Sequence, residues 1–351
     1  MKDITEAILN WYDENKRSLA WRDEVSPYRT LVSEVMLQQT RVEAVKPYFD
    51  RFMRSFPTVE ALAAASQDQV LAHWSGLGYY SRARNLHHAA RQIVALGEFP
   101  STLSEIRKLK GVGEYITGAI GSIAFNIDTP AVDGNHHRVL SRIFRSKGER
   151  KDMWKLAETL LPKGRAGDFN QALMDIGSGI CQAKTPKCEN CPIATYCQAF
   201  LHQEVHDYPI KKKKKIVPTE TYISLRSIQK DKILLGQRPS KGLYGGMMEP
   251  PMFCVSNVSD VSASVGADVF QKKLDISLEN HRVVGFVEHV LTHKKMIVYI
   301  LDAELVGEPK QAHYQALQAY RLDTIKELGI STLASKIIRF REASQQRLPF
   351  S

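Results

Sequence analysis

Apolar residues recur at helical spacing through the first 200 residues of the chain. An apolar residue every three or four positions places a continuous stripe on one side of a helix, and that stripe packs against a core. The alternation of β-branched and polar residues that is typical of a strand is missing from this part. We therefore predict an all-helical domain over residues 1–200, with stripes in Ile4–Tyr12, Leu31–Val45, Val70–Trp74, Ala83–Val94 and Trp154–Leu161.

The pattern changes after Pro218, where short runs rich in β-branched and aromatic residues are separated by glycine, proline and polar turns. Runs of this length and composition are typical of strands. We predict an α+β domain over residues 218–351, with strands in Tyr222–Leu225, Ile233–Leu235, Arg282–Val287 and Met296–Leu301.

Five consecutive lysines, Lys211–Lys215, precede this change. We assign residues 201–217 to a basic linker between the two domains. A run of like charges is usually solvated and occasionally contacts phosphate, and the sequence leaves both roles open. A chain of 351 residues is long enough for two domains of average size.

The chain is basic, with a formal net charge of +10 and an isoelectric point near 9.2. Such a charge favours a nucleic-acid partner. No apolar run reaches the length of a membrane span, so we expect no membrane association. The N-terminus is amphipathic and contains acids, unlike a secretory signal or a transit peptide. We expect a cytoplasmic protein whose cysteines are reduced.

The stretch Leu109–Asn135 combines a glycine turn, an apolar helix and an acidic loop. Gly111 and Gly113 bracket Val112, and glycine permits positive φ and close approach to another molecule. Backbone amides at the start of the following helix suit a phosphate group. Asp133 follows at the far end of that helix. On these residues alone, a phosphate grip with a catalytic acid and an ordinary helix-turn-helix corner with an exposed Asp are equal alternatives.

A second acid, Glu34, lies among the apolar residues of the predicted helix Leu31–Val45. Burial disfavours the ionised form of a carboxyl group, so the pKa of Glu34 should be raised. A carboxyl group that stays protonated near neutral pH can act as a general acid. Taken alone, these residues favour the alternative, a surface Glu on an amphipathic helix.

Four cysteines, Cys181, Cys188, Cys191 and Cys197, follow the spacing C-x6-C-x2-C-x5-C. Four thiols so close together in a reducing compartment indicate a metal site. Zinc and an iron–sulfur cluster both accept cysteine ligands. We expect the fifth cysteine, Cys254, to be a buried free thiol.

Several stretches resemble the MutY-type adenine DNA glycosylases, a branch of the helix-hairpin-helix, endonuclease III superfamily. They are L-x-G-V-G (Leu109–Gly113), S-E-V-M-L-Q-Q-T (Ser33–Thr40), L-A-W-R (Leu19–Arg22) and G-L-G-Y-Y-S-R-A-R-N-L-H (Gly76–His87). The family usually has proline where this chain has Ala20. The cysteine spacing matches the iron–sulfur loop of the same superfamily, which implies a structural 4Fe–4S cluster at residues 181–197.

The resemblance implies an enzyme of base excision repair that removes adenine opposite 8-oxoguanine, and less well opposite guanine, after flipping the adenine out of the duplex. Glu34 would protonate a ring nitrogen of adenine. Asp133 would stabilise the oxocarbenium ion, so that two carboxyl groups share the work as in glycoside hydrolysis. Tyr115 and Asn135 would orient Asp133 and the attacking water. The two acids need surroundings that move their pKa values apart.

The same resemblance assigns residues that contact the DNA. An inserted side chain offsets the stacking that is lost when a base is flipped. The adenine pocket would be lined by Arg17, Trp21, Arg22 and Leu37; the backbone would be held by Gly111, Val112 and Gly113; and Gln39, Thr40, Leu77 and Tyr79 would press into the duplex around the opposing base.

Tyr115 stands where lyase-competent relatives resembling endonuclease III carry a lysine. A tyrosine cannot form the Schiff base with the sugar that such a lyase needs. The resemblance therefore implies a monofunctional glycosylase, with Lys108 and Lys110 near enough to support weak lyase activity at most.

The run L-L-G-Q-R-P-S-K-G-L-Y-G-G (Leu234–Gly246) resembles the MutT-like, Nudix-type C-terminal domain of this family. The acidic run that holds magnesium in a Nudix hydrolase does not follow it, so we expect a domain that reads the opposite base. The family's Phe-Ser-His loop corresponds to Leu291, Thr292 and His293, and the resemblance assigns 8-oxoguanine recognition to Thr292 and His293. Leu291 replaces the aromatic residue. For His293, a solvated strand-end histidine is the alternative.

The last residues, Gln345–Phe350, resemble the Q-x-x-L-x-F peptides that dock on the bacterial sliding clamp. We expect a monomer whose partners are double-stranded DNA with an A:8-oxoguanine or A:G mispair and, through this tail, the clamp. Three other functions match parts of the sequence: a bifunctional pyrimidine glycosylase-lyase, a non-catalytic DNA-binding module and nucleotide-pool hydrolysis. Tyr115 argues against the glycosylase-lyase, and the pair of acids, Glu34 and Asp133, argues against a non-catalytic module. The missing magnesium ligands argue against nucleotide hydrolysis.

Overall fold

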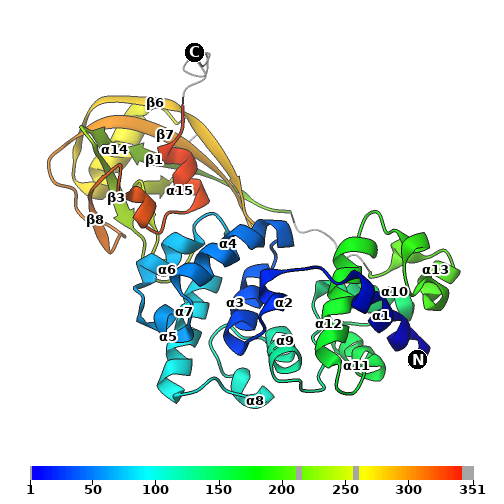
Figure 1. The fold of residues 1–351 in the computed structure, drawn as a ribbon. Helices are drawn as coiled ribbons and strands as arrows, with labels where there is room; N and C mark the ends of the chain where they lie inside the picture. The colour runs from blue at the N-terminus through cyan, green and yellow to red at the C-terminus, as the bar shows by residue number, and fades with distance from the viewer. Residues whose placement is uncertain (1, 211–215, 256–260, 342–351) are drawn as a thin grey trace, which may run out of the picture. The chain divides into compact units, whose positions relative to one another are not determined.

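The computed structural model describes residues 2–210, 216–255 and 261–341, which form two compact units (Figure 1). The first unit contains residues 1–64 and 85–213, and the second contains residues 65–84 and 214–351. This division differs from the predicted boundary, because residues 65–84 pack within the second unit although their sequence pattern continues that of the helical part. Lys211–Lys215 and Gln345–Phe350 lie outside the described residues.

The first unit is helical, as predicted (Figure 1). Its helices are α1 Lys2–Asn15, α2 Ala20–Asp23, α3 Pro27–Leu37, α4 Val42–Ser55, α5 Val59–Ala64, the part of α7 Ser81–Leu96 from residue 85 onward, α8 Leu103–Ile106, α9 Glu114–Ala124, α10 Gly134–Ile143, α11 Arg150–Leu160, α12 Ala166–Asp175 and α13 Gln198–Leu201. Short helical turns follow α12 at Ile176–Ile180, Cys188–Asn190 and Ala194–Tyr196, and a further one lies at Val205–Asp207.

The helix that carries Glu34 is shorter than the apolar pattern predicted. The Ser26 hydroxyl accepts a hydrogen bond from the Arg29 amide, and Pro27 occupies the first helical position, so α3 has a clear start. It ends at Leu37, and α4 begins only at Val42. The prediction of one helix over Leu31–Val45 is wrong because Gln39 has a left-handed backbone, with φ of 55°, which interrupts the helical hydrogen bonds.

In the core of the first unit, α3, which contains Glu34, packs against α9, and α10, which follows Asp133, packs against α12. Helix α12 packs against α1, α9 and α10, while α3 packs against α4 and α9. Ile8 of α1 and Phe169 of α12 are fully buried in this core, as the apolar stripes require. Gly118 of α9 lies so close to the following loop that a Cβ there would be 2.1 Å from the Pro130 oxygen. A small residue is therefore required where α9 supports the loop that leads to Asp133.

In its described residues the second unit contains two four-stranded sheets with helices, in agreement with the predicted α+β domain (Figure 1). One sheet has the order β5-β1-β7-β6, and in the other β3 pairs with β2, β4 and β8. The strands are β1 Thr219–Arg226, β2 Ile228–Gln229, β3 Lys232–Gln237, β4 Met248–Glu249, β5 Met252–Cys254, β6 Ser277–Val290, β7 Lys295–Val306 and β8 Ala316–Arg321. The four predicted strands correspond to β1, β3, β6 and β7, and β2, β4, β5 and β8 were not predicted.

Of the helices described, two pack against the sheet that contains β1 and β6. Helix α14 (Ala263–Leu274) packs against β6, and α15 (Thr332–Ile338) packs against β1 and β6. Helix α6 (Gln67–Trp74) contacts the helical turn Ile325–Glu327. In the part of the chain that the structure describes, no helix has both the length and the apolar composition needed to cross a membrane.

Candidate active site

Glu34 lies on the buried face of α3 and contacts the first turn of α9. Its side chain is among the buried ones, and the Tyr115 hydroxyl donates a hydrogen bond of 2.6 Å to its Oε2. Burial raises the pKa of Glu34, and the hydrogen bond from Tyr115 only partly opposes this. The predicted direction of the shift is therefore confirmed, and the surface alternative for Glu34 is excluded. A protonated Glu34 is available as a proton donor.

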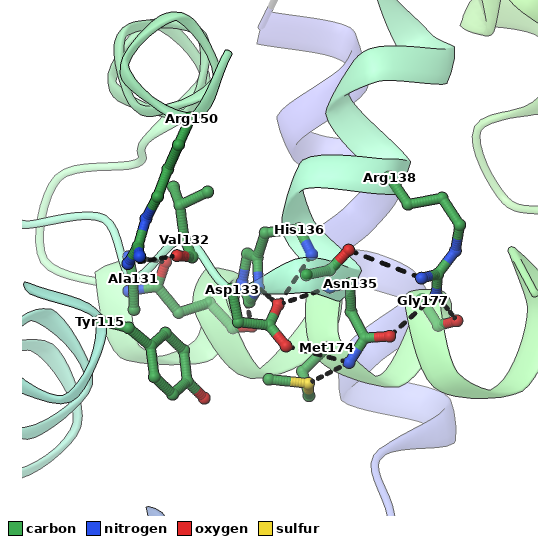
Figure 2. A network of polar contacts seen from close by, with 12 residues as sticks. Tyr115, Ala131, Val132, Asp133, Asn135, His136, Arg138, Arg150, Met174 and Gly177 are labelled. Atoms are coloured by element: carbon green, nitrogen blue, oxygen red, sulfur yellow. Dashed lines mark hydrogen bonds and ion pairs between the residues drawn. The ribbon is translucent and has the colours of Figure 1, made fainter. Parts of the chain in front are cut away.

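Asp133 precedes α10 and caps its N-terminus (Figure 2). Its Oδ1 accepts hydrogen bonds of 2.8 Å from the backbone amides of Asn135 and His136. The side-chain amide of Asn135 donates to Oδ2 over 3.1 Å. Burial would raise the pKa of Asp133, but the hydrogen bonds and charge of His136, with these amides, lower it. The two acids therefore have pKa values moved in opposite directions, as the chemistry requires.

The contacts of Tyr115 differ from the predicted ones. Its hydroxyl bonds to Glu34, whereas Asn135 bonds directly to Asp133. The phenol therefore contacts Glu34, the acid to which the resemblance assigned proton donation, and the orienting role of Tyr115 toward Asp133 stays a prediction. Asn135 has the partner that the resemblance assigned to it.

Two residues at this site were missed by the sequence analysis. His136 is buried with its Nδ1 2.7 Å from Asp133 Oδ1, and Asn170 of α12 accepts from its Nε2 over 2.9 Å. The spacing Asp-x-x-His at a helix start would have indicated the first contact, since the third helical residue commonly turns back toward the cap. Nothing local in the sequence indicates the contact with Asn170.

Arg138 connects the acid loop with the cysteine loop (Figure 2). Its Nη2 donates to Asn135 Oδ1 over 2.8 Å and to the Gly177 oxygen over 2.6 Å, and its Nε donates to the Cys181 oxygen over 2.7 Å. A planar guanidinium with several donors can hold three acceptors at fixed angles. The orientation of Asn135, and through it of Asp133, therefore depends on the start of the cysteine loop.

The four cysteines of the loop line one apolar hollow of about 20 Å³. Within the described residues no three His, Cys, Asp or Glu side chains converge as a single metal ion would require, and the thiols are spread around the hollow. Burial raises the pKa of Cys191 to about 12, so a thiolate there needs a compensating positive charge. Arg142, which is 2% exposed, directs Nη1 to the Cys181 sulfur over 3.2 Å.

This arrangement fits a 4Fe–4S cluster. Each thiolate of such a cluster binds its own iron, so the four sulfur atoms surround a space and do not meet at a point. Cys181, Cys188, Cys191 and Cys197 would hold the cluster, and the Arg142 guanidinium supplies a hydrogen bond to one ligand sulfur. The expectation for Cys254 is wrong, since its side chain is exposed at the end of β5.

Two of the four residues assigned to the adenine pocket contact one buried carboxylate. Arg17 and Arg22 both form ion pairs with Asp175, the last residue of α12, and the distance from Arg22 Nη1 to Oδ2 is 2.7 Å. Trp21 is buried edge-on against Phe49, with ring centroids 5.2 Å apart. Asp175 was not predicted, because it is 153 positions from Arg22. Burial opposes its ionisation, yet the two arginines lower its pKa.

Leu37, the fourth predicted pocket residue, is half-buried at the end of α3. A cleft of about 400 Å³ lies against the other side of the arginine pair, lined in part by Tyr12, Arg17 and Arg22. The lining of this cleft includes neither Glu34 nor Leu37. The structure thus brings Arg17 and Arg22 together but does not outline a pocket that contains all the predicted residues.

The predicted phosphate grip is the turn between α8 and α9. Gly111 has φ of 79°, and a Cβ there would lie 2.6 Å from the Asn85 Cβ. Gly113 precedes α9 with φ of −94°, so the expected positive φ is found at the first glycine and not at the second. Val112 is buried, and the amides that follow belong to the start of α9. The alternative of an ordinary corner is compatible with this geometry as well.

Of the four residues assigned to the duplex around the opposing base, Gln39 and Tyr79 are exposed. Gln39 is exposed at the turn between α3 and α4, and Thr40 beside it is half-buried. In the second unit, Tyr79 is 45% exposed with φ of 48°, and the Arg82 guanidinium lies 5.4 Å from its ring. Leu77 is buried, which is contrary to a role at the surface.

The predicted reading loop lies at the turn between β6 and β7, where Thr292 and His293 are exposed. The neighbouring Lys294 donates to Glu220 over 2.7 Å and to the Tyr222 hydroxyl over 2.8 Å, which ties the turn to β1. Glu249, which follows the MutT-like stretch, is buried and paired with Arg238 over 2.7 Å. The Glu249 carboxylate is therefore engaged in an ion pair within the second unit.

Three family models match the chain. Residues 32–163 match the HhH-GPD superfamily base excision DNA repair protein, residues 181–197 match the iron–sulfur binding domain of endonuclease III, and residues 222–340 match the NUDIX domain. The adenine DNA glycosylase of Buchnera aphidicola subsp. Baizongia pistaciae is 35% identical over 95% of this chain and 95% of its own length.

The chain belongs to the adenine DNA glycosylase family.

The human adenine DNA glycosylase is 31% identical over 97% of this chain and 74% of its own length. The Arabidopsis thaliana enzyme is 33% identical over 98% of this chain, which spans only 65% of that relative. As a member of this family, the protein is an enzyme that hydrolyses N-glycosyl bonds in base excision repair, and the iron–sulfur match supports a 4Fe–4S cluster at its cysteines.

Solved structures agree with the fold of the helical part. A thermostable thymine-DNA glycosylase is 31% identical, with a TM-score of 0.53 over 56% of this chain and 95% of that one. Endonuclease III in a non-covalent complex with DNA is 21% identical, with a TM-score of 0.51 over 57% of this chain and 94% of that one. At that identity the second likeness concerns the fold alone.

Proposed function

We propose that this adenine DNA glycosylase removes adenine paired with 8-oxoguanine, and more slowly adenine paired with guanine, from duplex DNA. The observation that carries the proposal is the pair of acids in the first unit. Glu34 has a raised pKa and Asp133 a lowered one, which is the division of roles needed to break a glycosidic bond. The exposed Thr292 and His293 of the second unit support reading of the opposite base.

In the proposed mechanism, Glu34 donates its proton to a ring nitrogen of the flipped adenine. The bond from adenine to the sugar then breaks with its electron pair moving to the base, and the sugar acquires oxocarbenium character. Ionised Asp133 stabilises that positive charge, and water adds to the anomeric carbon and loses a proton, which restores the protonated form of Glu34. The Tyr115 hydroxyl, already bonded to Glu34, stabilises the Glu34 carboxylate that remains after proton transfer.

We further propose that the enzyme is monofunctional. Tyr115 is half-buried with its hydroxyl bonded to Glu34, and burial of that hydroxyl together with the charge of Glu34 holds the pKa of Tyr115 well above the ordinary value. A phenol in this state is no nucleophile, and its side chain cannot form an imine. The product would be an abasic site in an uncut strand.

The DNA contacts in this proposal are the turn Gly111–Gly113, the turn residues Gln39 and Thr40, and the exposed Tyr79. The exposure of Gly111, Gln39 and Tyr79 supports the assignment, and the burial of Val112 and Leu77 weakens their part in it. Action on DNA in the cytoplasm as a monomer, and clamp docking through Gln345–Phe350, remain parts of the proposal.

Single-turnover release of adenine tests the proposal directly. Duplexes with adenine opposite 8-oxoguanine and opposite guanine are compared, with the wild type and with Glu34→Gln, which preserves size but cannot donate the same proton. We expect the wild type to release adenine faster opposite 8-oxoguanine than opposite guanine. The rate in Glu34→Gln should fall by about a thousandfold or more, because the variant cannot protonate the departing adenine.

Borohydride treatment during the same reactions is the second measurement. We expect little covalent capture of the protein on DNA. Efficient capture would contradict the monofunctional assignment, and release by Glu34→Gln at nearly the wild-type rate would contradict the role of Glu34.

A further inference from the structure

His136 is buried in direct contact with Asp133. The imidazole is 1% exposed, and its Nδ1 lies 2.7 Å from Asp133 Oδ1. On the opposite side of the ring, Nε2 lies 2.9 Å from the backbone oxygen of Asn170. Buried polar atoms need hydrogen-bond partners, and each ring nitrogen has one.

Both partners of the ring are acceptors. A backbone carbonyl oxygen and an ionised carboxylate can each accept hydrogen bonds but cannot donate them. A neutral imidazole has a single N–H and can satisfy one of the two, whereas an imidazolium has two N–H groups and satisfies both. The geometry therefore fits a cationic ring held between Asn170 and Asp133.

Asn170 is itself fixed from several directions. Its Nδ2 donates to Ser122 Oγ over 2.9 Å and to the Thr129 oxygen over 3.0 Å, and its Oδ1 accepts from the Ala131 amide over 3.0 Å. The residue is buried in the middle of α12. The His136 ring is thus anchored on a frame that joins α9, the loop before Asp133 and α12.

We propose that His136 is a positioning residue for the glycosylase reaction: as an imidazolium anchored on Asn170, it holds the Asp133 carboxylate ionised and in one orientation toward the sugar. The proposal rests on the function proposed for Asp133 and adds a residue to which no role in the reaction has been given. His136 itself makes and breaks no bond with the substrate.

The charges around the pair give this cation a specific consequence. Glu34 of α3 and Tyr115 of α9 lie within electrostatic reach of Asp133, and Arg138 of α10 lies on its other side. Two carboxyl groups close together resist ionising at the same time. A cation bonded to Asp133 favours ionisation of Asp133, so Glu34 stays protonated. In agreement, His136 lowers the pKa of Asp133 against the effect of burial.

The pH dependence of single-turnover adenine release tests this role. His136→Val removes both donors, and His137→Val, the same change at the next residue of α10, is the matched control because the His137 ring faces Ser141. Asp133 acts in its ionised form, so the rate falls at acidic pH as it becomes protonated. Without His136 its pKa rises, and the acid limb of the profile should move to higher pH.

Below that limb the rate should fall about tenfold for each pH unit, so the ratio of wild-type to variant rates should grow as the pH falls. His136→Gln retains a donor but no charge. It should recover part of the rate near neutral pH and leave the acid limb displaced. A His136→Val enzyme with a lower melting temperature and an unmoved acid limb would show a purely structural role and would overturn the proposal.

A second measurement does not depend on the variant folding. The ¹⁵N resonances of His136 in the wild-type chain, labelled at histidine, should show both ring nitrogens protonated at neutral pH. A single neutral tautomer would overturn the proposal. If the wild type releases no adenine from any duplex, the proposed function fails, while the resonances still report the state of His136.

Discussion

At the scale of single residues, the proposed chemistry depends on the hydrogen bond from Tyr115 to Glu34. A charge-assisted hydrogen bond is stronger than a neutral one, so this contact favours the ionised form of Glu34. Burial favours the neutral form and has the larger effect. Tyr115 thus limits how far the pKa of Glu34 rises, and an acid whose pKa stays near the working pH transfers its proton most efficiently.

Tyr115→Phe should therefore move the alkaline limb of the pH–rate profile to higher pH. Glu34 acts in its protonated form, so the rate falls as the pH passes its pKa; without the hydrogen bond that pKa is higher, and activity persists further into the alkaline range. Single-turnover adenine release across the pH range is the measurement.

Tyr28→Phe is the matched control, since Tyr28 is a buried tyrosine of the same unit whose hydroxyl donates to the Phe56 backbone oxygen. It should leave the limb in place. An alkaline limb that stays fixed or moves to lower pH in Tyr115→Phe would show that the phenol does not control Glu34.

At the scale of elements, α10 joins the two functional parts of the first unit. Asp133 caps its N-terminus, and Arg138 and Arg142 from its next two turns contact the start of the cysteine loop. A cluster that binds the folded loop and not the unfolded chain stabilises the loop by its binding free energy. We therefore expect the cluster to support the geometry at Asp133 through α10.

Replacement of a cluster ligand tests this link. Cys191→Ser should lose the visible absorbance of the iron–sulfur cluster, become sensitive to proteolysis within residues 181–197 and release adenine more slowly, because Arg138 then lacks a fixed partner. Absorbance, limited proteolysis and single-turnover rate are measured on the same preparations.

Cys254→Ser is the control, since Cys254 is exposed and belongs to the second unit. It should retain the cluster and the rate. Full iron content in Cys191→Ser would remove Cys191 from the ligand set, and a normal rate without iron would separate the cluster from the geometry of Asp133.

At the scale of the whole molecule, the second unit includes residues 65–84 as well as the C-terminal part of the chain. Leu71 lies against Gly329, Ser75 Oγ donates to the Ile330 oxygen over 2.8 Å, and Arg84 donates to the Gly245 oxygen over 2.7 Å. A chain that ends at residue 217 would lose these contacts and expose apolar side chains. Deletion of the C-terminal part is thus a poor test of what that part recognises.

The role proposed for the second unit is better tested by the double variant Thr292→Ala, His293→Ala in the full chain. Both side chains are exposed, so the melting temperature should change little. The preference for adenine opposite 8-oxoguanine over adenine opposite guanine should fall, because a hydroxyl and an imidazole that distinguish the two bases are lost. The measurement is the ratio of single-turnover rates on the two duplexes.

Ser104→Ala with His281→Ala provides a control of the same residue classes at exposed positions outside the reading loop. It should leave the ratio unchanged. An unchanged ratio in the Thr292, His293 variant would remove this loop from the recognition of 8-oxoguanine.

Local sequence patterns were sufficient for much of this protein. Periodicity predicted the helical and β-rich parts, and ligand spacing predicted the cysteine loop. Glycine predicted the turn at Gly111. Each of these signals lies within one short segment of the chain. The burial of Glu34 did not follow in this way: its neighbours alone favoured a surface position, and the packing of α3 against α9 decided it. Nor did the end of α3, because the left-handed backbone at Gln39 is not encoded by periodicity.

Tertiary structure decided which residues meet. Tyr115 and Glu34 are 81 positions apart, and Asp175 and Arg22 are 153 apart, so no pattern along the chain could assign these partners. The packing of α3 against α9 brings Tyr115 to Glu34, and the packing of α12 against α10 places Asn170 behind His136. Contacts with the C-terminal part of the chain assign residues 65–84 to the second unit. Residue types are properties of the sequence, whereas hydrogen-bond partners and the pKa shifts they cause exist only once distant helices have packed.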